Sequence, residues 1–265
     1  MNYQETKDYL TNYYEHYDED GRLGSKHGMI EYLTTMKYIE KYLQPNMRIL
    51  EIGAATGRYS HALAQKGYHV DAVELVEHNI EIFKQNTTPG EPVTVIQGNA
   101  MDLSVFENDT YDITLLLGPM YHLFTTEDKL KALSEAIRVT RKNGILFVAY
   151  CMGDASVLSY GFIRGEIYNI IEKCMLNTET FDTFSNPWDI FELHRKEDID
   201  KLRSEFNVTQ LHFVASDGYT NHMRKTVDNM DDRMYALYVK YHLATCERAD
   251  MVGYSHHTLD IFRKE

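Results

Sequence analysis

The segment that most constrains the fold is residues 49–57, Ile-Leu-Glu-Ile-Gly-Ala-Ala-Thr-Gly, in which a short apolar run passes directly into a glycine-bearing turn. We expect a helix next, over 58–66, and then a second strand over 69–73 that ends on Glu74. A strand, a small-residue turn, a helix and a strand ending in a carboxylate are typical of one half of a nucleotide-cofactor site. The turn glycines let the backbone approach a ligand, and the carboxylate can accept hydrogen bonds from two ribose hydroxyls.

An acid in this turn distinguishes two kinds of cofactor loop. Dinucleotide-binding turns follow G-x-G-x-x-G and require no acid. Here Glu51 precedes Gly53 and Gly57, and Ala55 stands between the two glycines. The pattern resembles the acid-x-Gly-x-Gly-x-Gly turn of the class I S-adenosylmethionine-dependent methyltransferases, with Ala55 in place of the middle glycine. Alanine fits that position wherever its φ stays negative, so we expect a modest departure.

Three further segments resemble this family in the right order, and together the resemblance covers about residues 30–150. Glu74 matches the acid that holds the ribose. The segment 98–102, Gly-Asn-Ala-Met-Asp, matches the family's Gly-Asp-Ala-x-Asp run, with Asn99 in place of the acid that binds the adenine amino group. An amide oxygen can still accept from that amine, and Asp102 is the alternative partner.

The third segment is 117–123, Leu-Gly-Pro-Met-Tyr-His-Leu, which resembles a run that lines the methyl-transfer site in many small-molecule methyltransferases. The resemblance therefore implies S-adenosyl-L-methionine as cofactor, Tyr121 and His122 as candidate catalytic residues, and a set of cofactor-binding residues. That set is Glu51, Gly53, Ala54, Ala55, Gly57, Glu74, Leu75, Asn99, Ala100, Met101, Leu117 and Gly118.

His122 has two interpretations. A neutral imidazole with a pKa near 6.5 can take a proton from an attacking hydroxyl or ammonium at physiological pH. The alternative is a histidine that packs or hydrogen-bonds beside the cofactor, because a sulfonium is already an activated electrophile and alignment can supply most of the rate.

Aromatic and basic residues outside the nucleotide fold are candidates for contacts to the substrate. Rings over a cationic sulfonium gain cation–π attraction, although tyrosines on an amphipathic helix are also common packing residues. The N-terminal candidates are Tyr14, Tyr17 and Arg22. The candidates from the later part of the chain are Arg164, Trp188, Phe184, Phe191 and His194.

Strands and helices alternate through the first 150 residues, which predicts a doubly wound α/β fold with a mostly parallel sheet. Helix 126–140 is expected to end at Asn143-Gly144. The predicted strands cover 48–52, 69–73, 93–97, 113–117, 145–149, 208–214 and 257–263. The resemblance implies seven strands in the order 3-2-1-4-5-7-6. We expect one domain over 1–265, with an N-terminal helical cap at 1–45 and lid insertions at 150–200 and 217–255.

Composition excludes several other classes. The 40 acidic and 27 basic residues give a net charge of −13, which disfavours a nucleic-acid partner. No run approaches the ~20 apolar residues of a membrane span, and the N-terminus has no export signal, so we expect a cytoplasmic protein without a membrane partner. The three cysteines and twelve histidines show no metal-ligand spacing, so no metal is expected. Monomer and homodimer both stay open.

These patterns favour a methyltransferase that moves a methyl group to an oxygen or nitrogen of a small molecule by in-line displacement. Two alternatives remain at this point. One is a protein that binds S-adenosylmethionine or S-adenosylhomocysteine without turnover. The other is a nicotinamide-dependent oxidoreductase, which Glu51 and the missing third glycine disfavour. The acceptor itself does not follow from the sequence, because a fold hosts many functions.

Overall fold

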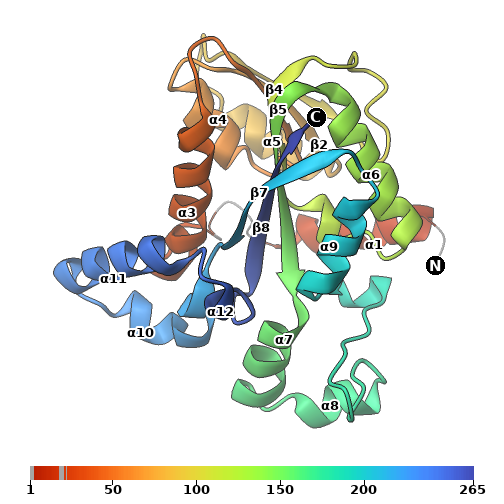
Figure 1. Cartoon of the computed structure of the whole chain (residues 1–265), viewed down its shortest axis with the longest axis vertical. Coiled ribbons are helices and arrows are strands. Elements are labelled where there is room, and N and C mark those ends of the chain that lie inside the picture. Colours follow the sequence, from red (N-terminus) through yellow and green to blue (C-terminus); the bar gives the residue numbers. More distant parts are fainter. Residues whose placement is uncertain (1–2, 18–20, 22) are drawn as a thin grey trace.

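The computed structural model describes residues 3–17, 21 and 23–265, so the predicted site residue Arg22 lies outside the described residues. An eight-stranded sheet crosses the molecule with helices on both faces (Figure 1). Its strands are β1 (Arg48–Ile52), β2 (His69–Glu74), β3 (Val93–Gln97), β4 (Tyr111–Leu116), β5 (Thr140–Met152), β6 (Leu193–His194), β7 (Val208–Ala215) and β8 (His257–Lys264).

The strand order is β3-β2-β1-β4-β5-β8-β7, with β6 paired to β5 outside this path. The first five strands are parallel, and β8 runs antiparallel between β5 and β7. The predicted order is confirmed, because β7 and β8 take the places of its sixth and seventh strands. The two-residue β6 raises the number of strands from the expected seven to eight.

Helices make up the rest of the described secondary structure. The α-helices are α1 (Tyr3–Glu15), α3 (Lys26–Tyr42), α4 (Arg58–Ala64), α5 (Glu77–Asn86), α6 (Thr126–Val139), α7 (Gly153–Ser156), α8 (Ile167–Glu172), α9 (Lys196–Ser204), α10 (Arg224–Asp228), α11 (Asp232–Thr245) and α12 (Ala249–Val252). Short 3₁₀ helices are η1 (Pro119–Tyr121), η3 (Pro187–Asp189) and η4 (Gly218–Met223), and η2 (Val157–Ile163) is a π-helix.

Alternating side chains of the strands divide the core between the two faces of the sheet. Leu50 and Ile52 of β1 pack with α6 and α9, whereas Ile49 packs with α3 and α4. In Figure 1, α3 and α4 lie to the left of the strands and α6 and α9 to the right. Because side chains alternate along a strand, the acid between Leu50 and Ile52 points to the α4 face, where Ser60 meets it.

The end of α6 differs from the prediction. The helix stops at Val139, and β5 begins at Thr140 and includes Asn143 and Gly144. Thr140 is extended, and its hydroxyl donates to the Ala136 carbonyl at 2.6 Å, which satisfies one carbonyl of the last helical turn. Asn143 then adopts a positive φ of 62° within the strand. The Asn-Gly pair therefore marks an irregularity in the strand rather than the end of the helix.

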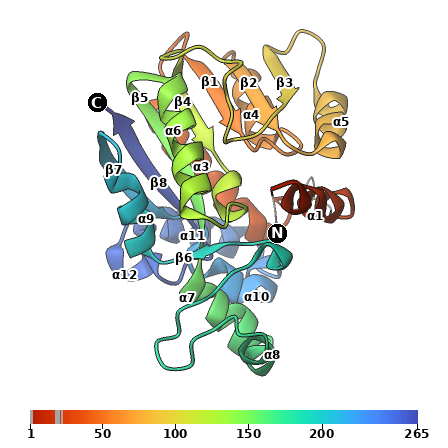
Figure 2. The ribbon, with the colours of Figure 1, turned by 90° about the vertical axis from the view of Figure 1, so that its right-hand side faces the viewer.

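The carboxyl ends of the parallel strands face the lower part of the molecule. Figure 2 shows α1 at this edge, next to α5, and the segment from α7 to α8 further below it. In an open α/β sheet, ligands bind outside the carboxyl ends near the point where the strand order reverses, here between β1 and β4. The helices added at the N-terminus and after β5 thus surround the edge where a ligand is expected.

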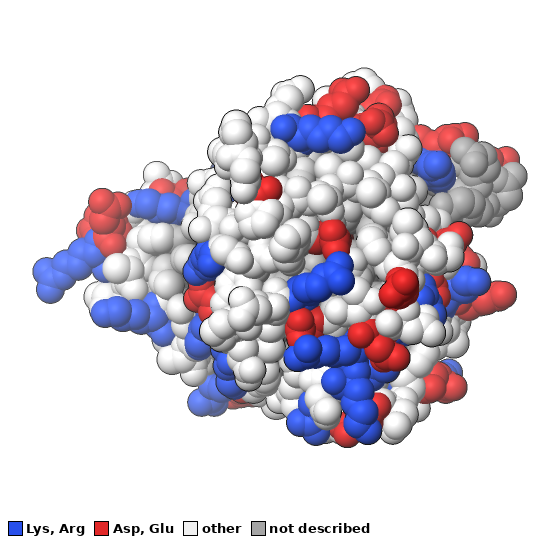
Figure 3. Space-filling view, turned by 90° about the horizontal axis from the view of Figure 1, so that it is seen from above, with Lys and Arg blue, Asp and Glu red and all other residues white. Residues whose placement is uncertain are grey.

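Two properties bear on the partners that the protein can have: the length and hydropathy of its helices, and the distribution of charge on its surface. Within residues 3–17, 21 and 23–265, no helix is both long and apolar enough to cross a membrane. Basic and acidic side chains are interspersed over the face seen in Figure 3.

Candidate active site

One continuous cavity of about 240 Å³ opens at the carboxyl ends of β1, β2 and β4. One part of its wall comes from the turn after β1, the end of β2 and the loop after β3. A second part comes from η1 and the segment 117–125, and α1 and the start of α3 cover it. Segments that the sequence analysis assigned to cofactor and acceptor therefore meet in a single space.

The turn after β1 is held by the neighbouring strand. The backbone N–H groups of Gly53 and Ala54 both donate to the Val73 carbonyl, at 2.8 and 3.1 Å. Gly53 has a φ of 79°, and a Cβ there would lie 2.6 Å from the Pro119 side chain. The glycine is therefore required both for the backbone conformation and for the close approach of the loop after β4.

Ala55 corrects the expectation of a negative φ, since its φ is 48°. A left-handed alanine costs about 1–2 kcal/mol, so this turn is maintained by its surroundings. The backbone N–H of Ala55 donates to Glu74 Oε2 at 2.8 Å, a charge-assisted hydrogen bond between the turn and the end of β2.

Glu51 supports this turn from behind. Its side chain is buried and accepts a short hydrogen bond from the Ser60 hydroxyl of α4. Burial raises the pKa of Glu51 to about 8, and the Ser60 hydrogen bond only partly opposes that shift. The acid that distinguishes the motif thus links β1 to α4 in a largely protonated state at neutral pH.

Glu74 faces the cavity while holding the loop around it. Besides Ala55, it accepts the backbone N–H of Val76 at 2.9 Å through Oε1. Burial raises the pKa of Glu74, and the backbone hydrogen bonds oppose the shift. The Asn79 side-chain amide also donates to Oε1, at 3.5 Å. A carboxylate offers about four lone-pair sites, so the remaining capacity for a ribose hydroxyl is mainly on Oε2.

The loop after β3 places Asn99 and Ala100 at the cavity. Asn99 Oδ1 accepts the backbone N–H of Met101 at 3.0 Å, which fixes the side chain within the turn. Asp102 is exposed and accepts the Ser104 N–H, and Met101 packs against the core; neither lines the cavity. Asn99 is accordingly better placed than Asp102 to meet an adenine.

The run 117–123 brings Tyr121 and His122 to the cavity. His122 Nδ1 lies 2.9 Å from the Ile190 carbonyl, which can only accept, so Nδ1 carries the hydrogen. Nε2 then accepts from the Tyr14 hydroxyl of α1 at 2.9 Å. Burial lowers the pKa of His122 to about 4, with the Ile190 contact opposing. The imidazole is neutral, and both of its nitrogens are engaged.

The other predicted substrate residues that the structure describes do not line the cavity. Tyr17 is exposed and stacks on Tyr13, with ring centroids 5.3 Å apart. Trp188 is 60 % exposed and packs edge-on against Tyr9. Four more candidates are absent from the cavity lining: Arg164, Phe184, Phe191 and His194. Of these, His194 is buried beside Tyr150.

Two cavity residues, Arg58 and Glu31, were not predicted. Arg58, the first residue of α4, has a buried Nε without a hydrogen-bond partner, and its guanidinium lies 4.7 Å from the Tyr32 ring. An arginine directly after the last glycine of the turn was the available sequence signal. At the end of the cavity near Tyr121, Glu31 and His257 are also lining residues, whereas the adjacent His256 is not.

The comparisons with known proteins agree with this geometry. Residues 49–144 match the model of a methyltransferase domain. Residues 49–144 therefore form a methyltransferase domain of the class I S-adenosylmethionine-dependent kind. S-Adenosyl-L-methionine is the cofactor of this family.

The relatives differ in how much of this chain they match. YqeM of Bacillus subtilis, described as a methyltransferase, is 26 % identical over 42 % of the chain, and the match spans only 44 % of YqeM. A ubiquinone biosynthesis O-methyltransferase of Rickettsia typhi is 24 % identical over 73 % of the chain and 78 % of its own length. A solved S-adenosylmethionine-dependent methyltransferase of Methanosarcina mazei shares the fold, with a TM-score of 0.57 and 17 % identity over 86 % of this chain and 96 % of its own.

The lining of the cavity can be compared with the chemical groups of S-adenosyl-L-methionine. The wall of the cavity contains the Glu74 carboxylate, the turn at Gly53 and the guanidinium of Arg58, whose buried Nε has no hydrogen-bond partner. S-Adenosylmethionine has ribose hydroxyls that a carboxylate can bind and an amino-acid carboxylate that a guanidinium can bind, so the chemistry of this lining fits the group.

Proposed function

We propose that this chain binds S-adenosylmethionine at the ends of β1, β2 and β4 and transfers its methyl group to a small molecule by in-line displacement. The observation that carries the proposal is that one cavity contains the Gly53 turn, Glu74 and the segment from Gly118 to His122. The bound cofactor supplies a methyl group on a cationic sulfur.

The residues at the cofactor end have distinct roles in this proposal. Glu74 accepts the ribose hydroxyls, and Asn99 with Ala100 meets the adenine. The backbones of Gly53 and Gly118 leave room for the methionine part, because neither adds a side chain at the close approach of the two loops. Arg58 binds the methionine carboxylate, which would satisfy its Nε.

At the other end, we assign Tyr14, Tyr121 and His122 to positioning of the acceptor. General-base catalysis requires a ring nitrogen that can take a proton, and His122 already uses both of its nitrogens. The Tyr14–His122 hydrogen bond instead fixes α1 over the cavity. Exclusion of water and alignment of the nucleophile are what such a closure contributes.

Isothermal titration calorimetry tests the cofactor assignment. We expect S-adenosylmethionine and S-adenosylhomocysteine to bind and NAD to give no heat above dilution. Binding of NAD without any response to S-adenosylmethionine would instead support an oxidoreductase. Formation of S-adenosylhomocysteine in the presence of acceptors separates an enzyme from a protein that only binds the cofactor.

A further inference from the structure

The segment that leads into β6 contains a strained turn. We call residues 187–192, which begin with η3, the strap. Ile190 in its centre has a φ of 69° and a ψ of −44°, and the Phe191 N–H donates to the Asp189 carbonyl across it at 2.8 Å. This is a γ-turn of the rare kind with positive φ, and positive φ is especially unfavourable for a β-branched residue.

The strap bears a second cost besides the turn. Oδ2 of Asp189 is buried and has no hydrogen-bond partner among the described residues. A backbone conformation as rare as that of Ile190 persists only where surrounding contacts impose it, and such residues cluster at ligand clamps and switch regions. The contacts that the strap makes therefore indicate what the strained turn is for.

Two hydrogen bonds join the strap to the segment assigned to methyl transfer. His122 Nδ1 donates to the Ile190 carbonyl at 2.9 Å. Two residues on, the Glu192 N–H donates to the Tyr121 carbonyl at 2.8 Å. Because a carbonyl can only accept, the position of the Ile190 carbonyl decides which nitrogen of His122 carries the hydrogen. The strained turn thus sets the tautomer of this histidine.

The same tautomer holds α1 over the cavity. With its hydrogen on Nδ1, His122 accepts from the Tyr14 hydroxyl through Nε2, at 2.9 Å. Closer to the start of α1, the Tyr9 hydroxyl donates to the Trp188 carbonyl of the strap at 2.9 Å, and the two rings meet edge-on with centroids 5.1 Å apart. The strap therefore lies against α1, at the edge of the sheet where Figure 2 shows this helix. Together they form one cover, and His122 is the joint between them.

A buried ion pair fixes the end of the strap to α6. Lys129 Nζ donates to Glu192 Oε1 at 2.5 Å, and the two side chains are only 9 % and 15 % exposed. Removal of one partner from a buried pair leaves the other charge unpaired, which has a much larger effect than loss of an exposed pair. The ion pair is therefore the anchor that opposes the strain of the turn.

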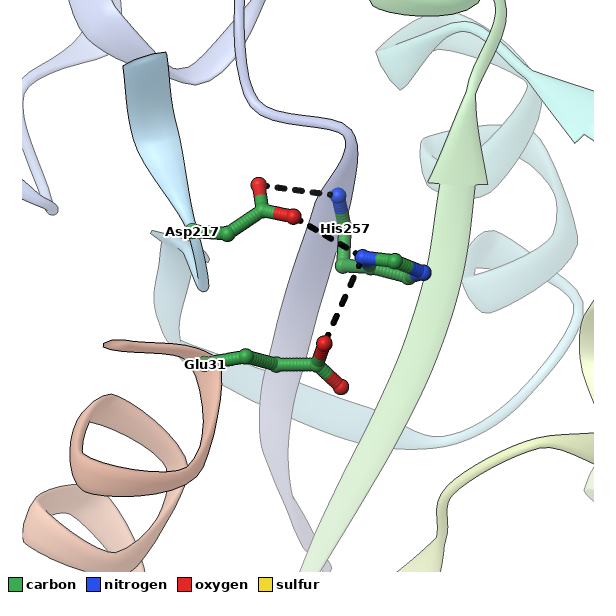
Figure 4. A group of neighbouring side chains, drawn as sticks. All are labelled: Glu31, Asp217 and His257. Carbon is green, nitrogen blue, oxygen red and sulfur yellow. Dashed lines mark hydrogen bonds and ion pairs between the residues drawn. The ribbon is translucent and has the colours of Figure 1, made fainter. Parts of the chain in front are cut away.

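The tyrosine that the strap holds also contacts a rigid group of the cavity wall. The ring centroid of Tyr121 is 6.2 Å from that of His257 and 6.0 Å from that of Phe191. Asp217 accepts from His257 Nδ1 at 2.9 Å, and Glu31 Oε2 lies 3.5 Å from the same nitrogen (Figure 4). The ring of Tyr121 is thus in contact with a fixed imidazole and with the strap at once.

We propose that the strap is a latch, in which the turn at Ile190 holds His122 and α1 over the bound cofactor and relaxes to let ligands exchange. The inference rests on the proposed function, because the cavity under this cover is assigned to the cofactor and the acceptor. Strain in the turn favours opening, whereas the ion pair and the two hydrogen bonds favour closure. Ile190, Lys129 and Glu192 are then positioning residues for methyl transfer.

Release of S-adenosylhomocysteine tests the latch without an acceptor. Radiolabelled ligand is bound and chased with excess unlabelled ligand, and acrylamide quenching of Trp188, the single tryptophan of the chain, reports opening of the strap. We expect Lys129→Gln to release the ligand more than about tenfold faster than the wild type and to increase the quenching. Lys196→Gln is the matched control, since Lys196 pairs with Asp200 at 45 % exposure and should release at the wild-type rate.

Two substitutions at one position isolate the strain. Ile190→Ala and Ile190→Gly both remove the buried side chain, but only alanine is strained at a positive φ. In an ordinary loop glycine would open more readily than alanine, because its backbone has more conformational freedom. Here we expect the reverse, with release from Ile190→Gly about threefold slower than from Ile190→Ala.

Tyr9→Phe tests the attachment of α1 with little risk to folding, because it removes only an exposed hydrogen bond to the strap. Release should be about threefold faster than in the wild type. Equal release rates in the wild type, Lys129→Gln and Tyr9→Phe would overturn the latch and leave the proposed function in place. Release from Ile190→Gly as fast as from Ile190→Ala, or faster, would do the same. Failure of the wild-type protein to bind S-adenosylhomocysteine would overturn the proposed function itself.

Discussion

The cofactor end and the acceptor end of the cavity are built from different parts of the chain. The groups at the cofactor end come from loops that follow β1, β2, β3 and β4, between Glu51 and Gly118, and many of their contacts are made by backbone atoms. The acceptor end joins Glu31 to His257, more than 200 positions apart, through side chains. We infer that the cofactor end depends on local backbone conformation and the acceptor end on tertiary packing.

The largest expected effect concerns Glu51, whose raised pKa couples the cofactor end to pH. The native protein binds one more proton than the unfolded chain between the ordinary pKa of 4.5 and about 8. Its contribution to stability is therefore complete below pH 4.5 and is lost as pH rises through about 8, by up to about 1.4 kcal/mol per pH unit.

Glu51→Gln removes this titration, so its unfolding free energy should fall less with pH than that of the wild type. Urea unfolding of both proteins from pH 5 to 8 measures the difference. Parallel curves would contradict protonation of Glu51 in the folded state.

The next effect concerns the last glycine of the turn. Gly57 has a φ of 88°, and a Cβ there would lie 2.5 Å from the Phe83 ring. We expect Gly57→Ala to lower the unfolding free energy by about 2–4 kcal/mol, from the left-handed conformation and the clash together. Gly90 is a matched control, because its φ is 84° and nothing lies within 4 Å of a Cβ. Gly90→Ala should lose only about 1–2 kcal/mol, and equal losses would show that packing does not matter here.

Removal of the Glu74 carboxylate tests the ribose assignment. We expect Glu74→Ala to weaken binding of S-adenosylmethionine by about 1–3 kcal/mol, because ribose hydroxyls and the Ala55 N–H lose their acceptor. Glu81→Ala, an exposed acid on the adjoining α5, should bind with wild-type affinity. An unchanged dissociation constant in Glu74→Ala would show that the ribose is bound elsewhere.

The smallest effect concerns the closure of α1. Tyr14→Phe and His122→Ala each remove the same hydrogen bond, so a double-mutant cycle in unfolding free energy should give a coupling of about 1 kcal/mol. Tyr17→Phe, in the exposed part of the same aromatic group, should show no coupling to His122. His122→Ala should also lower kcat less than about tenfold; a loss of 10²–10⁴ would restore the general-base interpretation.

Much of the cofactor end could be predicted because its signals are local. The alternation of apolar strands with helices predicted the doubly wound sheet, and the family resemblance implied its strand order. Glu51, Gly53, Glu74 and Asn99 all line the cavity. One local detail, the negative φ expected at Ala55, was wrong. Ala55 is left-handed because the Val73 carbonyl and the Glu74 carboxylate hold the turn, and those partners come from a different strand.

The acceptor end could not be predicted in the same way. Tyr14 and His122 were both candidates, but their hydrogen bond depends on where α1 lies against η1. Trp188 and Arg164 were expected at the acceptor and lie outside the cavity, since exposed aromatic and basic residues carry no signal of direction. Glu31 was not among the predicted site residues, because acidic residues are common on amphipathic helices.

By itself, the sequence determined the doubly wound fold and the position of the cofactor turn. Both depend on short-range periodicity, on glycine spacing and on the right-handed connection of neighbouring parallel strands. Only the tertiary structure decided which side chains meet at the far end of the cavity, because the antiparallel placement of β8 beside β5 brings His257 and Asp217 to Glu31. The partner of a side chain across the fold is set by the packing of distant segments, so it cannot be predicted from the residues next to that side chain in the sequence.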